Sequence, residues 1–138
     1  MSLRINNLAP YLKSIADIPF KWGVHDCLIF TNQAFREMYG IGWAEDWLGR
    51  YMRDGQPMKR DDLKAEFGFA SFTKAVDARL IRVRGVPPRG ALVTTRRARR
   101  WVTGNAMGIA TGVKAAFVGR HGIVYHPIDT IDKAWVKT

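Results

Sequence analysis

The chain's only cysteine, Cys27, follows an acid directly and stands two residues after His25 in the stretch K-W-G-V-H-D-C. Asp26 suits a helix N-cap and Gly40 suits the far end, so the pattern predicts a helix over residues 26–39. The first turn of a helix favours a thiolate, because free N–H groups and the helix dipole face it. The carboxylate of Asp26 opposes that effect, and a lone cysteine is commonly a small buried hydrophobe. A nucleophile and a core residue are therefore both open interpretations of Cys27.

A nucleophilic thiol at neutral pH needs a neighbouring base or cation. His25 reaches the thiol only in an irregular loop, and a polar loop residue bonded to backbone is the simpler reading. The three histidines and one cysteine include no zinc spacing such as C-x-x-C or H-E-x-x-H. We also find no phosphate-binding glycine loop. We therefore expect no metal and no cofactor.

The predicted elements divide into helices first and strands afterwards. Besides the helix over 26–39, the pattern predicts helices over residues 10–16, 44–53, 60–67 and 71–79. Short β-rich runs follow at residues 80–83, 91–95, 105–111, 115–118, 122–125 and 134–136, separated by glycine and proline turns. This order predicts an α+β fold in which N-terminal helices pack on a C-terminal antiparallel β-sheet. With 138 residues and no linker-like tract, we expect one domain over residues 1–138.

The positive charge is concentrated in one segment. The net charge is +10, and the segment from Arg79 to Arg100 contains eight arginines and no acid. Within it, a basic run and an aromatic residue fall between two predicted strands: Arg96, Arg97, Arg99, Arg100 and Trp101. Arginine and tryptophan are favoured anchors in protein interfaces, so we expect this run to contact a protein partner. A solvated loop is the alternative, and nucleic acid is not expected because no nucleic-acid motif accompanies the arginines.

The region around Cys27 resembles a known family. F-K-W-G-V-H-D-C-L-I-F is similar to the Y-x-W-G…D-C segment that opens the catalytic helix of NlpC-type papain-like peptidases. More narrowly, it resembles a phage and prophage tail-associated group with the signature PF-x-W-G-x-H-D-C. Residues 88–93 are similar to that family's P-x-G-D-L-V strand, residues 106–109 to its H-V-G-I strand, and residues 125–127 to its I-H-A-P segment. The resemblance covers roughly residues 19–136 and implies a papain-like fold.

The resemblance also shows where the chain departs from a working peptidase. It implies that Cys27 takes the nucleophile's position, while the position of the general base falls on Ala106, which cannot accept a proton. The strand aspartate of the family is Ala91 here, and the tyrosine before the W-G pair is Phe20. The third polar position is kept as His126, so a direct pair between Cys27 and His126 is conceivable.

Two hypotheses follow. The first is a structural or interaction protein of a phage tail tip or baseplate, built on a papain-like fold without its catalytic base, whose partners are other tail proteins. The second is an active cysteine endopeptidase that cuts peptidoglycan stem peptides as the phage enters the cell, with His126 or His25 as base. The departures at Ala106 and Ala91 favour the first. The sequence shows no signal peptide and no membrane span, so we expect synthesis in the host cytoplasm. The resemblance to the tail-associated group implies a final place in the virion.

Overall fold

The structure is a computed structural model that describes residues 4–97 and 106–138. Its helical elements are η1 (Arg4–Asn7), α1 (Leu8–Ser14), α2 (Cys27–Tyr39), η2 (Glu45–Trp47), α3 (Arg60–Phe67), α4 (Phe72–Asp77) and η3 (Ile128–Thr130). Its strands are β1 (Met52–Arg53), β2 (Gln56–Pro57), β3 (Ile81–Arg82), β4 (Leu92–Thr95), β5 (Ala106–Ala110), β6 (Lys114–Gly119), β7 (Gly122–Pro127) and β8 (Lys133–Val136). The α+β fold with helices followed by an antiparallel sheet is confirmed.

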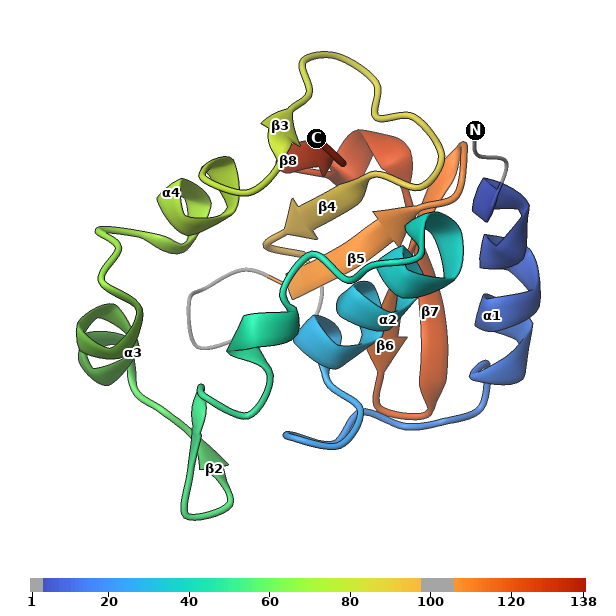
Figure 1. The fold of residues 1–138 in the computed structure, drawn as a ribbon. Coiled ribbons are helices and arrows are strands. Elements are labelled where there is room, and N and C mark those ends of the chain that lie inside the picture. Colours follow the sequence, from blue (N-terminus) through green and yellow to red (C-terminus); the bar gives the residue numbers. More distant parts are fainter. Residues whose placement is uncertain (1–3, 98–105) are drawn as a thin grey trace.

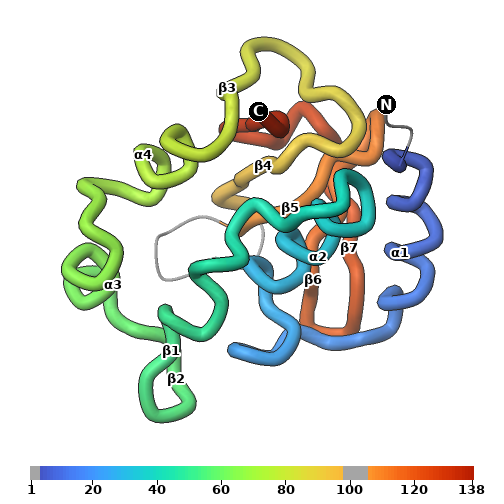
Figure 2. Tube along the Cα trace, viewed as in Figure 1, coloured from blue at the N-terminus to red at the C-terminus, as the bar shows by residue number. Residues whose placement is uncertain are grey.

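The main sheet has the strand order β3-β8-β4-β5-β6-β7, and every pair in it is antiparallel. Helix α2 lies across β5 and β6, and α1 packs beside α2 (Figure 1). The chain between α2 and β3 lies to one side of the sheet and carries the β1–β2 hairpin, α3 and α4 (Figure 2).

Two apolar clusters cover the two faces of the sheet. Alternate residues of a strand point to opposite faces, so β5 contributes Met107 and Ile109 to one cluster and Ala106 and Ala110 to the other. The first and larger cluster contains α2, including Cys27. The second contains small side chains and one ring, Phe117. Which face a strand residue occupies therefore decides whether it can approach the start of α2.

Helix α2 forms where the sequence predicts it. Its cap, Asp26, has extended backbone and accepts a hydrogen bond from the N–H of Ile29 at 2.9 Å. At the other end Gly40 adopts the left-handed conformation (φ 83°), and its N–H closes the last turn on the carbonyl of Arg36. A residue without Cβ is favoured there.

The predicted helix over residues 44–53 is wrong. Only the turn η2 forms, and a short hairpin of β1 and β2 follows it. Gly49 has a φ of 80°, and the hairpin turns at Asp54 and Gly55, which also have positive φ. These residues stop a helix, although the aromatic stripe of Trp43, Trp47 and Tyr51 is buried in the core as expected.

Candidate functional site

The start of α2 is built around a fully buried carboxylate rather than around the thiol. Besides capping Ile29, Asp26 accepts a hydrogen bond at Oδ2 from the N–H of Gly23 at 2.9 Å. The same oxygen accepts a short hydrogen bond from the hydroxyl of Tyr51, which is itself buried. Burial and the bond to Asp26 raise the pKa of Tyr51 far above its ordinary value, so its hydroxyl stays a donor. A buried charge with three donors is stabilised by its surroundings.

The loop before α2 is shaped to supply one of these donors. Lys21 and His25 form an isolated antiparallel bridge, with hydrogen bonds of 3.0 and 2.8 Å between their backbones. The tight turn between them passes through Gly23, whose φ of 75° lies in the left-handed region. This turn directs the N–H of Gly23 at Asp26. The sequence analysis considered Asp26 as a helix cap and as a charge beside Cys27. It missed the partners Gly23 and Tyr51, and Tyr51 is 25 residues away along the chain.

Cys27 is positioned as a core residue. Its side chain is 5% exposed, and burial, followed by the charge of Asp26, raises the pKa of the thiol to about 12. Backbone N–H groups, including that of Met107 on β5, favour the thiolate but do not outweigh these two effects. The thiol is therefore protonated at neutral pH and closed to solvent. Both conditions are the opposite of those that make a cysteine reactive.

His126 lies on the wrong face of the sheet to pair with Cys27. On β7 it stands opposite Ala115 of β6, a member of the second cluster, and its ring contacts Phe117 edge-on at 5.4 Å between centroids. Cys27 belongs to the cluster on the other face. The structure therefore does not bring Cys27 and His126 together, because the sheet separates the two side chains.

Ala106, at the position that the resemblance assigns to the base, lies on the same face of the sheet as His126. Ala106 packs in the second cluster, and its neighbour Met107 packs with Cys27. An alanine there supplies no base, and its Cβ lies on the face away from α2.

His25 lies close in sequence to Cys27 but does not act on it. The residue is 8% exposed, and its Nε2 is buried with no hydrogen-bond partner in the described structure. Burial lowers the pKa of His25, and the charge of Asp26 only partly offsets that effect. Across residues 4–97 and 106–138, no hydrogen bond joins a histidine to the thiol of Cys27. The interpretation of His25 as a loop residue bonded to backbone holds for its main chain only.

Three arginines of the segment from Arg79 to Arg100 have partners within the chain. Arg79 forms a bidentate pair with Asp46 at 2.5 and 2.6 Å, and Arg82 pairs with Asp77 at 2.9 Å. Arg89 donates to the carbonyl of Thr111 at 2.7 Å. Acids from earlier in the chain thus neutralise two of the arginines.

The predicted partner-binding run lies only partly within the described structure. The backbone N–H of Arg96 donates to Asp132 at 2.8 Å, which fixes the end of β4. Arg96 and Arg97 are both exposed. Arg99, Arg100 and Trp101 are outside the described residues, so the role of this run in contacting a protein stays a prediction.

No group of three or more histidine, cysteine, aspartate or glutamate side chains that could hold a metal ion occurs in residues 4–97 and 106–138. None of the helices that the structure describes is long and apolar enough to cross a membrane.

Comparison with known families gives one match. A family model described as a domain of unknown function, DUF6950, matches residues 3–136. The chain belongs to the DUF6950 family. No curated protein matches this DUF6950 chain. The match extends over α2, the hairpin, α3, α4 and the whole sheet, so the Asp26 network and the segment beside the sheet both lie within the family domain.

Proposed function

We propose that this DUF6950 domain is a structural or interaction component of a phage tail tip or baseplate, built on a papain-like, NlpC-type fold without catalytic chemistry. The observation that carries the loss of chemistry is the state of Cys27. Its thiol is buried, protonated at neutral pH and paired with no histidine in the described residues. The phage assignment, the tail partners and the virion location rest on the resemblance of the residues around Cys27 to the tail-associated group.

The arrangement of the core supports the papain-like part of the proposal. A helix that begins at a cysteine packs on an antiparallel sheet, with the backbone of the central strand β5 next to the thiol. A helix that begins at the cysteine and packs on the sheet is what the resemblance implies, whereas Ala106, at the position it assigns to the base, lies on the opposite face of the sheet. Here the strand presents Met107 to the thiol side, and the helix start has become a packed structural element.

The test is alkylation of the native protein with iodoacetamide between pH 6 and pH 9, compared with the same reaction in urea. We expect Cys27 to be inert in the native state and to react fully once unfolded, because its thiol is both buried and protonated. His25→Ala and His126→Ala should leave the native protein equally inert. Rapid native alkylation at pH 7 that either substitution abolishes would overturn the proposal and return the endopeptidase hypothesis.

A second measurement addresses the place of the protein in the particle. An antibody raised against the chain should detect it in purified phage particles that have been freed of soluble protein by density centrifugation. Incubation of the purified chain with peptidoglycan should release no new amino groups. A chain absent from particles would contradict the tail assignment without affecting the conclusion about Cys27.

A further inference from the structure

An open apolar pocket of about 280 Å³ lies between α3 and α4, in the segment beside the sheet. Aromatic side chains make much of its wall, and two small or aliphatic side chains complete the floor: Trp47, Phe67, Phe69, Phe72, Leu63 and Ala75. Trp47 is 4% exposed and Leu63 is 7% exposed, so the floor belongs to the core. The lining residues include neither Asp26 nor Cys27, and we call this site the α3–α4 pocket.

Helix α3 sorts its side chains by face. Arg60, Leu63, Lys64 and Phe67 line the pocket, and their spacing of three, four and seven residues places them on one side of a helix. Two of the three acids of the helix pair with arginines that do not line the pocket: Asp62 pairs with Arg53 at 3.7 Å, and Glu66 pairs with Arg50 at 3.1 Å. The face toward the pocket is therefore apolar and cationic. This spacing is the signal that sequence reasoning could have used to find the site.

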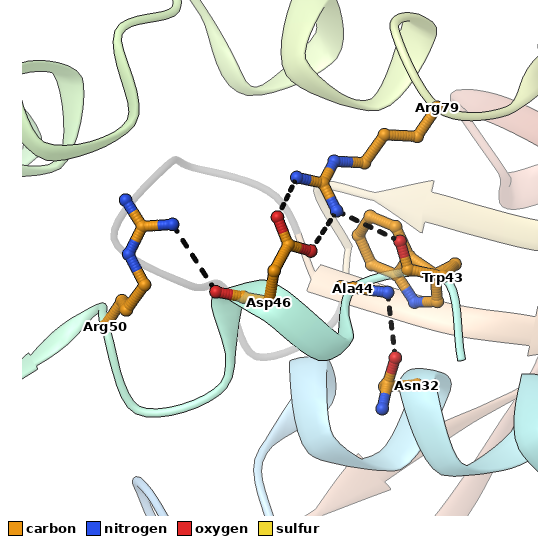
Figure 3. Close-up of polar contacts among 6 residues, drawn as sticks. All are labelled: Asn32, Trp43, Ala44, Asp46, Arg50 and Arg79. Atoms are coloured by element: carbon orange, nitrogen blue, oxygen red, sulfur yellow. Dashed lines mark hydrogen bonds and ion pairs between the residues drawn. The ribbon is translucent and has the colours of Figure 1, made fainter. Parts of the chain in front are cut away.

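Arg79 fixes Trp47, in the floor of the pocket, through an ion pair and a cation–π contact. Arg79 grips Asp46 with two hydrogen bonds and also donates to the carbonyl of Trp43 at 3.3 Å (Figure 3). Its guanidinium lies over the ring of Trp47, 4.0 Å from the centroid. These contacts join the floor to the turn that follows α2, where Asn32 accepts from the N–H of Ala44 at 2.8 Å. A pocket that is already formed costs little reorganisation when it binds.

Phe67, in the wall of the pocket, is likewise covered by an arginine. Arg50 lies over the ring of Phe67 at 4.8 Å and bonds Glu66 on the outer side of α3. The C-cap Gly68, with a φ of 73°, reverses the chain so that α4 can start at its cap Ser71. The two helices thus stand as fixed sides of one opening.

The charges at the rim have no partner within the described chain. Arg60 and Lys64 are exposed, and within residues 4–97 and 106–138 neither side chain forms an ion pair or a hydrogen bond. Arg50 and Arg79, by contrast, are already neutralised. An apolar opening with two unneutralised cations is complementary to an apolar group that carries negative charge beside it.

We propose that the α3–α4 pocket binds an acidic segment of a partner protein, which inserts one large apolar side chain between the helices. A pocket of about 280 Å³ has room for one large side chain. Tryptophan, phenylalanine and leucine are suitable anchors, and desolvated pockets of this kind concentrate binding energy. Carboxylates next to the anchor would contact Arg60 and Lys64. The inference names the partner's chemistry and rests on the proposed function only in taking the chain to act by binding.

The experiment is selection from a library of random 12-residue peptides displayed on yeast, with the purified full chain as bait. We expect enrichment of sequences with one large apolar residue flanked by aspartate or glutamate. A synthetic peptide of the enriched sequence should bind the double variant Arg60→Glu, Lys64→Glu at least 10-fold more weakly. It should bind the matched variant Lys114→Glu, Arg120→Glu with unchanged affinity, because those exposed cations lie on and next to β6, outside the pocket.

A third variant separates the pocket from its charge. Ala70 is an exposed lining residue, so Ala70→Trp should fill the opening without disturbing the core and should abolish binding. Enrichment of basic or purely polar peptides, no enrichment at all, or equal binding to all three variants would overturn the proposal. These outcomes would leave the alkylation result for Cys27 untouched, so a failure of this inference is distinguishable from a failure of the proposed function.

Discussion

The start of α2 and the α3–α4 pocket differ in where their polar groups find partners. At the start of α2, the carboxylate of Asp26 takes three hydrogen bonds from inside the chain. At the pocket, Arg60 and Lys64 stand exposed beside aromatic rings and find no partner among the described residues. The first region is closed by its own fold, and the second is complementary to something outside it.

The stretch with a recognisable motif and the stretch that forms a pocket are therefore different parts of the chain. The W-G-V-H-D-C stretch is the part of the sequence most suggestive of chemistry, yet its acid and its cysteine serve helix capping and packing. Segment 60–75 contains no recognisable motif, but it forms the opening with unsatisfied binding capacity.

The largest effect should follow the loss of Asp26. Asp26→Ala removes the helix cap and the carboxylate that accepts hydrogen bonds from the N–H of Gly23 and the hydroxyl of Tyr51. We expect the free energy of unfolding to fall by about 3 kcal/mol, as the sum of a lost cap and lost hydrogen bonds to a buried carboxylate. Urea unfolding monitored by circular dichroism measures it. Asp26→Asn keeps an acceptor for Ile29 and should lose less; equal stability of Asp26→Ala and the wild type would show that the network is not structural.

An intermediate effect should follow the loss of Arg79, which supports the pocket floor. Arg79→Met removes a partly exposed ion pair and a cation–π contact, so we expect a loss of about 1 kcal/mol in urea unfolding. The affinity for the selected acidic peptide should also fall, because the ring of Trp47 loses the cation–π contact that fixes it in the pocket floor.

Arg82 provides the matched control for that prediction. It pairs with Asp77 and lies over the ring of Trp135 at 5.2 Å, in the same manner as Arg79 but away from the pocket. Arg82→Met should cost similar stability and leave peptide affinity unchanged. Equal losses of affinity in both variants would mean that the floor of the pocket is not specifically supported by Arg79.

A smaller effect should appear in the pH dependence of stability. Burial lowers the pKa of His25 below its ordinary value of 6.5, so the unfolded chain binds a proton more readily than the folded one. The contribution of neutral His25 is fully present above pH 6.5 and decreases as the pH falls through the lower, folded-state pKa. His25→Gln should flatten the decrease in unfolding free energy between pH 6.5 and pH 5. An unchanged slope would show that His25 is not the titrating group.

The smallest effect on stability should come from the rim of the pocket. Arg60→Glu with Lys64→Glu changes two exposed side chains, so the free energy of unfolding should stay within about 0.5 kcal/mol of the wild type. Thermal unfolding of this variant beside Lys114→Glu, Arg120→Glu checks it. A large loss would place Arg60 and Lys64 among the structural residues and remove the contrast between the two regions.

Several elements could be predicted because their signals are local. Asp26 and the left-handed Gly40 mark the two ends of α2, each through a hydrogen bond to a residue three or four positions away along the chain. Short apolar runs between turn residues become β4 to β8. The helix over 44–53 failed because the apolar spacing of Trp43, Trp47 and Tyr51 fits a helix equally well as a buried turn and hairpin. Positive φ at Gly49 and Gly55 decided between them.

By itself, the sequence determined the α+β fold class and the helix that begins at Cys27. Each depends on residues that are neighbours along the chain. Only the tertiary structure decided that His126 faces away from Cys27, that Tyr51 completes the Asp26 network, and that Asp46 neutralises Arg79. These outcomes depend on strand register and on contacts between residues 25 or more positions apart, which no local pattern specifies. The α3–α4 pocket exists for the same reason: two short helices form it only when both are fixed against Trp47.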